Sequence, residues 1–383
     1  MYNWKLMDDT VTLRDRLKMA KFILTNSRLT NGPQVKYFEQ QWSDWLGCEH
    51  SLFVSSGSTA NSLLVSAWKE MYGIPDGAKV IVPACTWVTN IGPIIQNNLT
   101  PVFCDINLRN YSFDTNALQT IACEHKDISA IFVTHLLGFP AQVEDFRKIF
   151  PYAHILEDVC ESHGAVVEGG TMAGLCDVGG TFSFYFGHHM TTVEGGMVST
   201  NDPELYDLMR IKRSHGMARE SIYAESYAAA NPHINPAFLF VTDGYNFRNN
   251  EIGAVLGQSQ LCRLDDMIVK RNVNFREYYE LLEEKADLFH VPEYIPNRMS
   301  SFCFPFISKT VDTHNKLQAL LKEYRVEYRP VVGGNLLRQP FLKDYQADCP
   351  NADILQERGL YIGNSHFVTW EHLDMLEEIL EQL

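Results

Sequence analysis

Basic residues are scarce in this chain of 383 residues, which has 32 Lys and Arg against 47 Asp and Glu. The formal net charge of −15 argues against sequence-independent binding to nucleic acid or to an anionic membrane, because both need clustered cations. No apolar run approaches the roughly 20 residues that a membrane span requires. We therefore expect neither nucleic acid nor a membrane among the partners of this chain.

Closely spaced cysteines are also absent. The nine cysteines lie far apart, and the sequence has no Cys-x-x-Cys or Cys-x-Cys pair. Zinc sites and most iron–sulfur clusters use closely paired ligands, so we expect no metal site. Unpaired thiols and the lack of a signal-peptide pattern over residues 1–9 favour a cytoplasmic protein.

The stretch 183–200 contains no lysine, although it holds two histidines and a glutamate that could take part in proton transfer. An aromatic, strand-like segment breaks there at Gly187, and two histidines, His188 and His189, follow it. The next strand is expected after the turn 194–196. A histidine at such a break is placed to transfer protons near neutral pH. Because adjacent side chains of an extended segment point to opposite faces, only one of the two is expected to face a site.

Strands and helices alternate through the N-terminal two thirds of the chain, after a mainly helical segment over residues 1–50. The expected strands lie at residues 51–54, 79–82, 101–105, 130–133, 154–158 and 197–200. Apolar runs that alternate with helical segments are typical of a mostly parallel sheet covered on both faces. We therefore predict an α/β fold for this part of the chain.

The pattern changes near residue 258, where a long helix is expected over residues 258–285. Beyond it we expect strands at 300–307 and 326–329 and helices at 313–324 and at the C-terminus. We predict a large domain over residues 1–257, with the N-terminal helical segment included, and a small α+β domain over residues 258–383.

The segment 55–61 joins an expected strand to an expected helix and consists of small and hydroxyl-bearing residues. Small residues let the backbone approach an anion closely, and the free N–H groups of a helix N-terminus bind phosphate. The same Ser-Gly-Ser-Thr sequence is also an ordinary helix cap. By itself the segment leaves both interpretations open.

Trp87 and Asp158 lie at the ends of two other expected strands. Open α/β sheets bind ligands at this edge, so Trp87 is either a core side chain or a platform for stacking. The carboxylate of Asp158 either caps a helix or holds the protonated ring nitrogen of a pyridine cofactor. Neither residue decides between its two interpretations alone.

Together these features have the chain order of a pyridoxal 5′-phosphate (PLP) site. The chain resembles the fold-type I sugar aminotransferases and dehydratases of the DegT–StrS type over nearly its whole length. The matching segments are 30–33, 56–60, 83–87, 157–165, 183–196, 244–248 and 329–330. The resemblance implies a fold-type I PLP-dependent transferase, with a mostly parallel mixed sheet in the large domain and a smaller α+β C-terminal domain.

The resemblance also implies which residues contact the cofactor. Gly57, Ser58 and Ser183 would hold its phosphate. Trp87 would stack on its ring, and Asp158 would pair with the pyridine nitrogen.

Two further residues have implied contacts. Glu161 stands where many relatives have Gln and would lie beside the ring hydroxyl. Asn246 would reach the cofactor phosphate of a neighbouring subunit, because sites in the family form across a dimer interface. A homodimer with shared active sites is therefore implied.

Five polar side chains are candidate substrate contacts. His163, His215 and Arg219 are candidates for the sugar, although such residues more often make structural hydrogen bonds. Arg248 and Arg329 are candidates for the carboxylate of glutamate or the phosphates of a nucleotide.

The sequence departs from the aminotransferase pattern at one position. Aminotransferases of the family have a lysine in the segment 183–196 that binds the cofactor as a Schiff base. The register from Glu194 places His188 there, and histidine cannot form that bond. A small branch of the family has histidine at this position, and the chain resembles it locally, apart from Gly187 and Val193.

This resemblance implies a 3-dehydratase that uses PLP or pyridoxamine phosphate (PMP) and takes the amino group from L-glutamate. Such an enzyme removes the C3 hydroxyl of a nucleotide-linked 4-keto-6-deoxysugar, here GDP-4-keto-6-deoxymannose. The product is a 3,6-dideoxy-4-keto sugar for surface polysaccharide such as lipopolysaccharide O antigen. His188 would move the protons, and Asp158 would keep the ring nitrogen protonated.

Other interpretations of the sequence stay open. One is an aminotransferase-like enzyme with an altered reaction, and another is a non-catalytic PLP-binding paralogue that acts as a sensor or scaffold. A second histidine-bearing branch acts on CDP-sugars with an iron–sulfur cluster, but its Cys-x-Cys pair is missing here.

Overall fold

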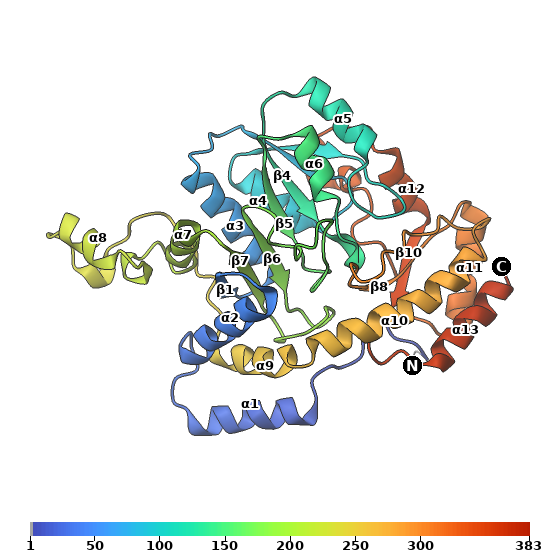
Figure 1. The fold of residues 1–383 in the computed structure, drawn as a ribbon, viewed down its shortest axis with the longest axis horizontal. Coiled ribbons are helices and arrows are strands. Elements are labelled where there is room, and N and C mark those ends of the chain that lie inside the picture. Colours follow the sequence, from blue (N-terminus) through green and yellow to red (C-terminus); the bar gives the residue numbers. More distant parts are fainter. Residues whose placement is uncertain (1–2) are drawn as a thin grey trace.

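A seven-stranded sheet forms the centre of the computed structural model, which describes residues 3–383 (Figure 1). The strand order is β1-β7-β6-β5-β4-β2-β3, and β7 runs antiparallel to β1 and β6 while the other pairs are parallel. The strands are β1 His50–Val54, β2 Lys79–Pro83, β3 Thr100–Cys104, β4 Ile128–Thr134, β5 His154–Asp158, β6 Gly179–Ser183 and β7 Gly196–Thr200. The predicted α/β fold with a mostly parallel mixed sheet is confirmed.

Helices cover both faces of this sheet, because side chains alternate between the faces along each strand. In β1, for example, Leu52 and Val54 pack in one buried cluster and Phe53 in the other. The first cluster includes α3 Gly57–Met71, α4 Gly92–Gln96 and α7 Pro203–Arg213, and the second includes α2 Pro33–Leu46, α5 Thr115–Glu124 and α6 Val143–Ile149. Within residues 3–383, no helix is both long and apolar enough to cross a membrane.

A smaller antiparallel sheet lies in the C-terminal part, at the right of Figure 1. Its order is β8-β10-β9, with β8 Cys303–Ile307, β9 Tyr328–Pro330 and β10 Gly359–Gly363. Its helices are α11 Val311–Glu323, α12 Pro350–Arg358 and α13 Trp370–Glu381. Trp4 packs into the same core and donates from its indole nitrogen to the Gly363 carbonyl at 2.9 Å. The N-terminal segment therefore packs against this sheet, while the domain boundary at residue 257 stays a prediction.

The prediction of one long helix over residues 258–285 is wrong. The structure has two helices, α9 Glu251–Leu261 and α10 Leu264–Glu283, separated at Cys262 and Arg263. Arg263 turns toward α1, Leu13–Thr25, and donates to the buried carboxylate of Asp15 at 2.9 Å. The break lets α9 pack against α1 and α2 while α10 continues to the smaller sheet (Figure 1).

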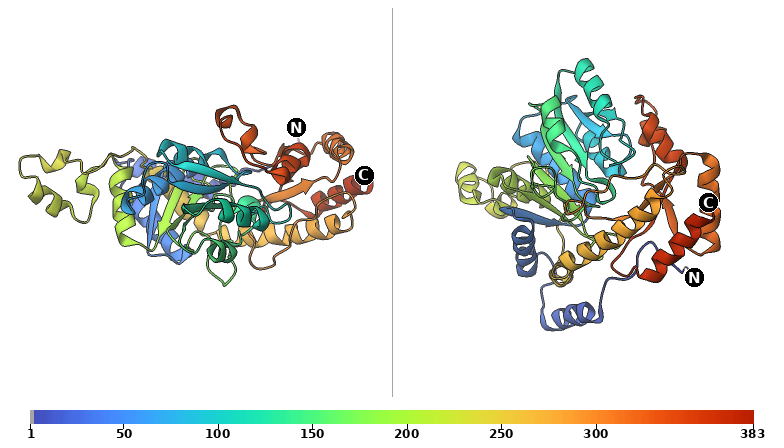
Figure 2. Two further views of the ribbon diagram at one scale, coloured as in Figure 1. Left: turned by 90° about the horizontal axis from the view of Figure 1, so that it is seen from above. Right: turned by 45° about the vertical axis from the view of Figure 1, so that its right-hand side comes forward.

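Residues 218–240 form an arm that projects from the body beyond α7 (Figures 1 and 2). The arm holds α8, Ala224–Ala230, between two short 3₁₀ turns, Ala218–Glu220 and Pro236–Phe238. Phe238 and Phe240 are 65% and 52% exposed on it. Large apolar side chains on a projecting segment mark a surface that favours contact with another protein.

Gly138 brings the segment before β8 against the large sheet. Its φ is +96°, and a Cβ at this position would lie 2.1 Å from the carbonyl oxygen of Ser300. The Ser300 N–H donates to the Gly138 carbonyl at 2.9 Å, and the Phe302 N–H donates to Leu137 at 3.2 Å. Only glycine fits this contact, which fixes where the segment 300–302 lies.

We predict that Gly138→Ala lowers the free energy of unfolding more than Gly169→Ala. Gly169 has a similar φ of +89° but open space where a Cβ would lie, so its alanine variant bears only the left-handed penalty of about 1–2 kcal/mol. Gly138→Ala adds the overlap with Ser300, about 1–3 kcal/mol more. Thermal unfolding of both variants measures the difference, and equal midpoints would contradict this account.

Candidate active site

A cavity of about 590 Å³ opens at the carboxyl ends of the parallel strands. Eight predicted site residues line it: Gly57, Ser58, Trp87, Asp158, Glu161, Ser183, His188 and Arg329. Side chains from the N-terminal segment and from β8, β9 and β10 complete the wall. The cavity thus lies where open α/β sheets bind ligands, between the large sheet and the smaller one.

The N-terminus of α3 forms one end of the cavity. Ser56 caps the helix, since its Oγ accepts the Thr59 N–H and Thr59 Oγ1 accepts the Ser56 N–H. The N–H groups of the first turn, at Gly57 and Ser58, have no partner inside the helix. A Cβ on Gly57 would lie 2.6 Å from Cβ of Ser183, so glycine is required for this approach. Backbone N–H groups and hydroxyls converge here, as an anion site needs.

Asp158 ends β5 and is almost fully buried. Its Oδ2 accepts a hydrogen bond from Asn61 Nδ2 at 2.8 Å, and its Oδ1 accepts one from the Cys160 N–H at 2.9 Å. Both donors stabilise a carboxylate rather than a carboxylic acid. The structure thus holds a negative charge at a fixed place in the cavity wall.

Glu161 follows on the same turn and has a different environment. Its Oε2 accepts a hydrogen bond from the Leu137 N–H at 3.0 Å. Burial raises the pKa of Glu161 from 4.5 to about 7, and the charge of Asp158 adds to the effect while the Leu137 contact opposes it. Glu161 therefore exchanges a proton near neutral pH, and in its protonated form it is a hydrogen-bond donor.

His188 and His189 occupy different environments. His188 lines the cavity, with its ring near Tyr185 and Phe302 at centroid distances of 6.2 and 5.6 Å. Burial lowers the pKa of His188 from 6.5 to about 4, so the ring is neutral at pH 7 and accepts a proton. His189 is fully buried outside the cavity, where its Nε2 lies 3.1 Å from the carbonyl oxygen of Ser300.

His163 does not contact the cavity, which corrects its interpretation as a sugar contact. The ring is fully buried and stacks near Phe182 and Phe184, with Trp42 at its edge. Burial lowers the pKa of His163 well below its ordinary value, so it packs as a neutral aromatic ring.

Two polar residues of the cavity wall are absent from the sites predicted from the sequence. Glu327 and Tyr361 line the cavity beside Arg329. Glu327 precedes Arg329 by two residues, and Tyr361 of β10 is the register partner of Arg329 in β9. Glu327 also accepts the Leu6 N–H at 3.0 Å, which ties the N-terminal segment to this wall. The two-residue spacing from Arg329 could have identified Glu327, because alternate residues of a strand share a face. Tyr361 could not be identified from the sequence, because its pairing with Arg329 depends on the fold.

Three predicted residues gather outside the cavity, next to the end of β1. Arg248 forms a bridge with Val54, and its guanidinium lies 3.2 Å from Asn246 Oδ1 and 3.3 Å from His215 Nε2. His215 adopts a φ of +65°, which is uncommon for a residue other than glycine. Asn246 is exposed. The three side chains form one polar cluster on the outer surface of the chain.

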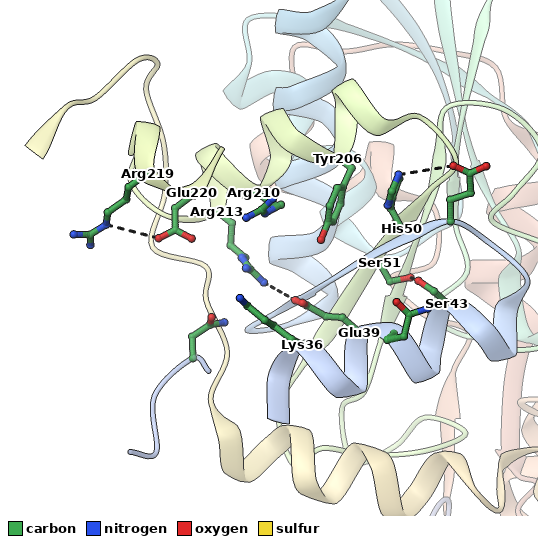
Figure 3. Close-up of a pocket in the computed structure, with 13 residues that line it drawn as sticks. Lys36, Glu39, Ser43, His50, Ser51, Tyr206, Arg210, Arg213, Arg219 and Glu220 are labelled. Carbon is green, nitrogen blue, oxygen red and sulfur yellow. Dashed lines mark hydrogen bonds and ion pairs between the residues drawn. The ribbon is translucent and has the colours of Figure 1, made fainter. Parts of the chain in front are cut away.

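Arg219 lies at a second cavity of about 440 Å³, shown in Figure 3. It pairs with Glu220 at 3.8 Å, while deeper in the same cavity Arg213 pairs with Glu39 at 2.7 Å (Figure 3). Lys36 of α2 points toward the space between them (Figure 3). Within one chain, Arg219 is thus separate from the cavity that holds His188.

The residues of the first cavity fit a PLP-type cofactor on structural grounds. Gly57 leaves the N-terminus of α3 open to an anion, and Asp158 offers a fixed carboxylate for a protonated ring nitrogen. Trp87, at 54% exposed, presents an uncovered ring surface to the cavity. Among the described residues that line the cavity there is no lysine, so covalent attachment of the cofactor has no candidate there.

The fold and these residues define the class of the protein, a fold-type I enzyme of the PLP-dependent kind. The chain belongs to the DegT/DnrJ/EryC1/StrS aminotransferase family, whose sequence model matches residues 12–381. The family resemblance stated from the sequence is therefore confirmed.

Known relatives and solved structures are similar over the full length. A GDP-4-keto-6-deoxy-D-mannose 3-dehydratase from Yersinia pseudotuberculosis is 33% identical over 396 residues, covering 100% of this chain and 99% of the relative. The enzyme of that name from Escherichia coli O55:H7 is 30% identical over 377 residues, covering 95% and 96%.

Crystal structures of GDP-4-keto-6-deoxymannose-3-dehydratase have the same fold. A histidine-to-asparagine variant with bound GDP-perosamine superposes with a TM-score of 0.91 at 29% identity, covering 99% of this chain and 100% of the other. A structure with a trapped PLP-glutamate geminal diamine has a TM-score of 0.87 at 30% identity and the same coverage.

We predict that Glu161→Gln changes how stability depends on pH. The folded pKa of about 7 lies above the unfolded value of 4.5, so the native state binds more protons between them. Wild-type stability should therefore fall as the pH rises through 7, by roughly 1–3 kcal/mol in this window. Glu161→Gln has no such charge to bury and should be more stable than wild type at pH 8.5, but similar at pH 4.

Thermal unfolding between pH 4 and 8.5, without added cofactor, measures this difference. Glu194→Gln is the matched control, because Glu194 also lines the cavity but is exposed. The same pH profile for wild type and Glu161→Gln would disprove the titration of Glu161 near neutral pH.

Proposed function

We propose that this protein is a PLP/PMP- and glutamate-dependent 3-dehydratase of a nucleotide-linked 4-keto-6-deoxysugar, most specifically GDP-4-keto-6-deoxymannose. The observation that carries the proposal is His188, a neutral, cavity-lining histidine where a lysine would otherwise bind the cofactor. The relatives named GDP-4-keto-6-deoxymannose 3-dehydratase support the choice of reaction and sugar. The structures with bound GDP-perosamine and with PLP and glutamate support the nucleotide, the cofactor and the amino donor.

The cofactor would be held by non-covalent contacts alone. Gly57, Ser58 and Ser183 would bind its phosphate at the N-terminus of α3, and Trp87 would stack on its ring. Asp158 would hold the proton on the ring nitrogen. When bound, the cofactor would supply an amine that condenses with the 4-keto group and a ring that accepts the electron pair of the broken C–H bond. The ring then returns this pair as the C3 hydroxyl leaves.

His188 would move the protons of this reaction. Its neutral ring accepts a proton from carbon, and the imidazolium so formed donates a proton to the departing C3 hydroxyl. Glu161 would donate a hydrogen bond to the ring hydroxyl in its protonated form, since it exchanges a proton near pH 7. In the overall balance the sugar loses one oxygen atom, L-glutamate becomes 2-oxoglutarate, and ammonia is released.

The wall that carries Arg329 and Tyr361 would bind the polar parts of the two substrates. Arg329 is exposed at the cavity, next to Tyr361, and is the candidate for a carboxylate of glutamate or a phosphate of the nucleotide. An aminotransferase with altered chemistry is the alternative, and the products separate the two reactions. Dehydration releases ammonia and removes the C3 oxygen, whereas transamination retains nitrogen in the sugar.

We infer a homodimer with shared active sites. The exposed Phe238 and Phe240 of the arm provide an apolar surface for a second copy. The outer cluster of Asn246, Arg248 and His215 would then reach the cavity of the partner, with Asn246 at the cofactor phosphate. Arg219, at the base of the arm, is a further candidate for contact across the interface.

We also infer a cytoplasmic location. All nine cysteines are free thiols in the structure, which fits a reducing compartment.

We predict that His188→Gln lowers the rate of dehydration by about 10²- to 10⁴-fold, the usual contribution of a proton-transfer group. Glutamine keeps the size and polarity of the side chain but cannot accept the proton. The rate is measured with GDP-4-keto-6-deoxymannose as substrate, from the release of ammonia and from the loss of one oxygen atom detected by mass spectrometry. Titration with PLP verifies that the variant still binds the cofactor.

His189→Gln is the control for this experiment, because His189 is buried against Ser300 and does not line the cavity. We expect it to lower thermal stability while the protein that remains folded keeps most of its activity. A dehydration rate unchanged by His188→Gln would rule out His188 as the proton-transfer group.

We predict that two inactive variants restore activity when they are mixed. His188→Gln disables one half of a shared site, and the double variant Asn246→Ala/Arg248→Ala disables the other half. In a randomly mixed dimer population half of the dimers are mixed and each has one intact site, so about a quarter of wild-type activity should return. Unfolding and refolding the variants together, followed by the ammonia assay, measures the recovery.

Variants refolded separately and then combined without exchange provide the control. If mixed dimers form and no activity returns, the sites are not shared between subunits.

A further inference from the structure

Asn61 lies directly behind Asp158 in the wall of the cavity. It is fully buried in α3, four residues after Gly57 and therefore on the same face of the helix. Its Nδ2 donates to Asp158 Oδ2 at 2.8 Å. Among the described residues, the carboxylate of Asp158 accepts hydrogen bonds from this side chain and from one backbone N–H, that of Cys160.

The orientation of the Asn61 amide follows from its surroundings. Thr181 Oγ1 donates to Asn61 Oδ1 at 2.5 Å, so the oxygen of the amide faces β6. On the other side, Nδ2 lies 3.3 Å from both the carbonyl oxygen and the hydroxyl of Thr89. A flipped amide would place its oxygen against the Asp158 carboxylate and a carbonyl, which is repulsive.

The two oxygens of Asp158 are thereby fixed separately. The backbone N–H of Cys160 holds Oδ1, and the amide of Asn61, itself held by Thr181, holds Oδ2. Asn61, Thr181 and Asp158 are all nearly or fully excluded from solvent, where a hydrogen bond to a charged group is strong. Of these two contacts, the one from Asn61 is made by a side chain, which a substitution can remove.

We propose that Asn61, oriented by Thr181, is a positioning residue that fixes the Asp158 carboxylate for its contact with the ring nitrogen of the cofactor. This inference rests on the proposed function, since it takes Asp158 as the partner of that nitrogen. Asn61 does not touch the reacting atoms and acts through the plane and the charge of Asp158. Thr181 acts one step further away, through the amide of Asn61.

The test uses the spectrum of the PLP-bound protein as a function of pH, which reports protonation of the ring nitrogen. Asn61→Leu keeps the volume of the side chain but removes the donor, so Asp158 should stabilise the ring proton less well. We expect the midpoint of the spectral change to move to lower pH by about one unit, the usual size of one hydrogen bond to a charged group. PLP affinity should fall by about tenfold for the same reason.

Matched variants separate positioning from a general loss of structure. Thr181→Val removes the hydroxyl that orients Asn61 and should shift the midpoint in the same direction, but by less. Thr181→Ser keeps the hydroxyl and should have the wild-type midpoint. Asn90→Leu changes another fully buried asparagine, one that bonds to Thr86 and not to Asp158, and should leave the midpoint unchanged. If Asn61→Leu does not fold, the comparison of Thr181→Val with Thr181→Ser still tests the positioning role of Asn61.

Asp158→Asn, measured in parallel, separates failure of the positioning role of Asn61 from failure of the proposed contact between Asp158 and the cofactor. If Asp158→Asn moves the midpoint but Asn61→Leu and Thr181→Val do not, the positioning role is overturned and the proposed function stands. If Asp158→Asn also leaves the spectrum unchanged, the proposed contact of Asp158 with the cofactor fails, and the role of Asn61 fails with it.

Discussion

The close approach between the N-terminus of α3 and the ends of β6 and β7 is the constraint on which the rest of the site depends. A Cβ on Gly196 would lie 2.3 Å from the carbonyl oxygen of Ser56, and one on Gly57 would lie 2.6 Å from Cβ of Ser183. Because both positions are glycine, the helix start reaches the sheet edge with its N–H groups exposed to the cavity. This contact positions the end of the cavity that we propose binds the cofactor phosphate, together with the turn that carries His188.

A buried polar network behind the sheet supports the strand that ends in Asp158. Ala141 N–H donates to His135 Nδ1 at 3.0 Å, so His135 is protonated on Nε2 and donates to Glu157 at 3.0 Å. Glu157 also accepts the N–H groups of Gly174 and Cys176. Burial alone would raise the pKa of Glu157, but these contacts lower it below the ordinary value. Adjacent carboxylates on one strand thus have separate tasks, one structural and one facing the cavity.

Several parts of the site could be predicted because they depend on strand ends and short spacings. Asp158 ends β5 and Ser183 ends β6, and a strand end locates its side chain at the ligand-binding edge of an α/β sheet. Asn61, by contrast, is an ordinary polar residue in a helix until Asp158 and Thr181 are brought beside it. The helix break at Arg263 was missed because its cause, the buried carboxylate of Asp15, lies about 250 residues earlier in the chain.

The sequence by itself determined the α/β class, the family and the replacement of a lysine by His188, since strand periodicity, glycine turns and residue identity are local properties. Only the tertiary structure decided that His188 faces the cavity while His189 packs on Ser300, because the choice depends on the segment that Gly138 holds against the large sheet. The same holds for the pKa: burial by distant elements lowers the pKa of His188 from 6.5 to about 4, a shift that the identity of the residue does not predict. The sequence specifies that residue 188 is a histidine, but the pKa and the orientation of its side chain depend on contacts that form only in the folded protein.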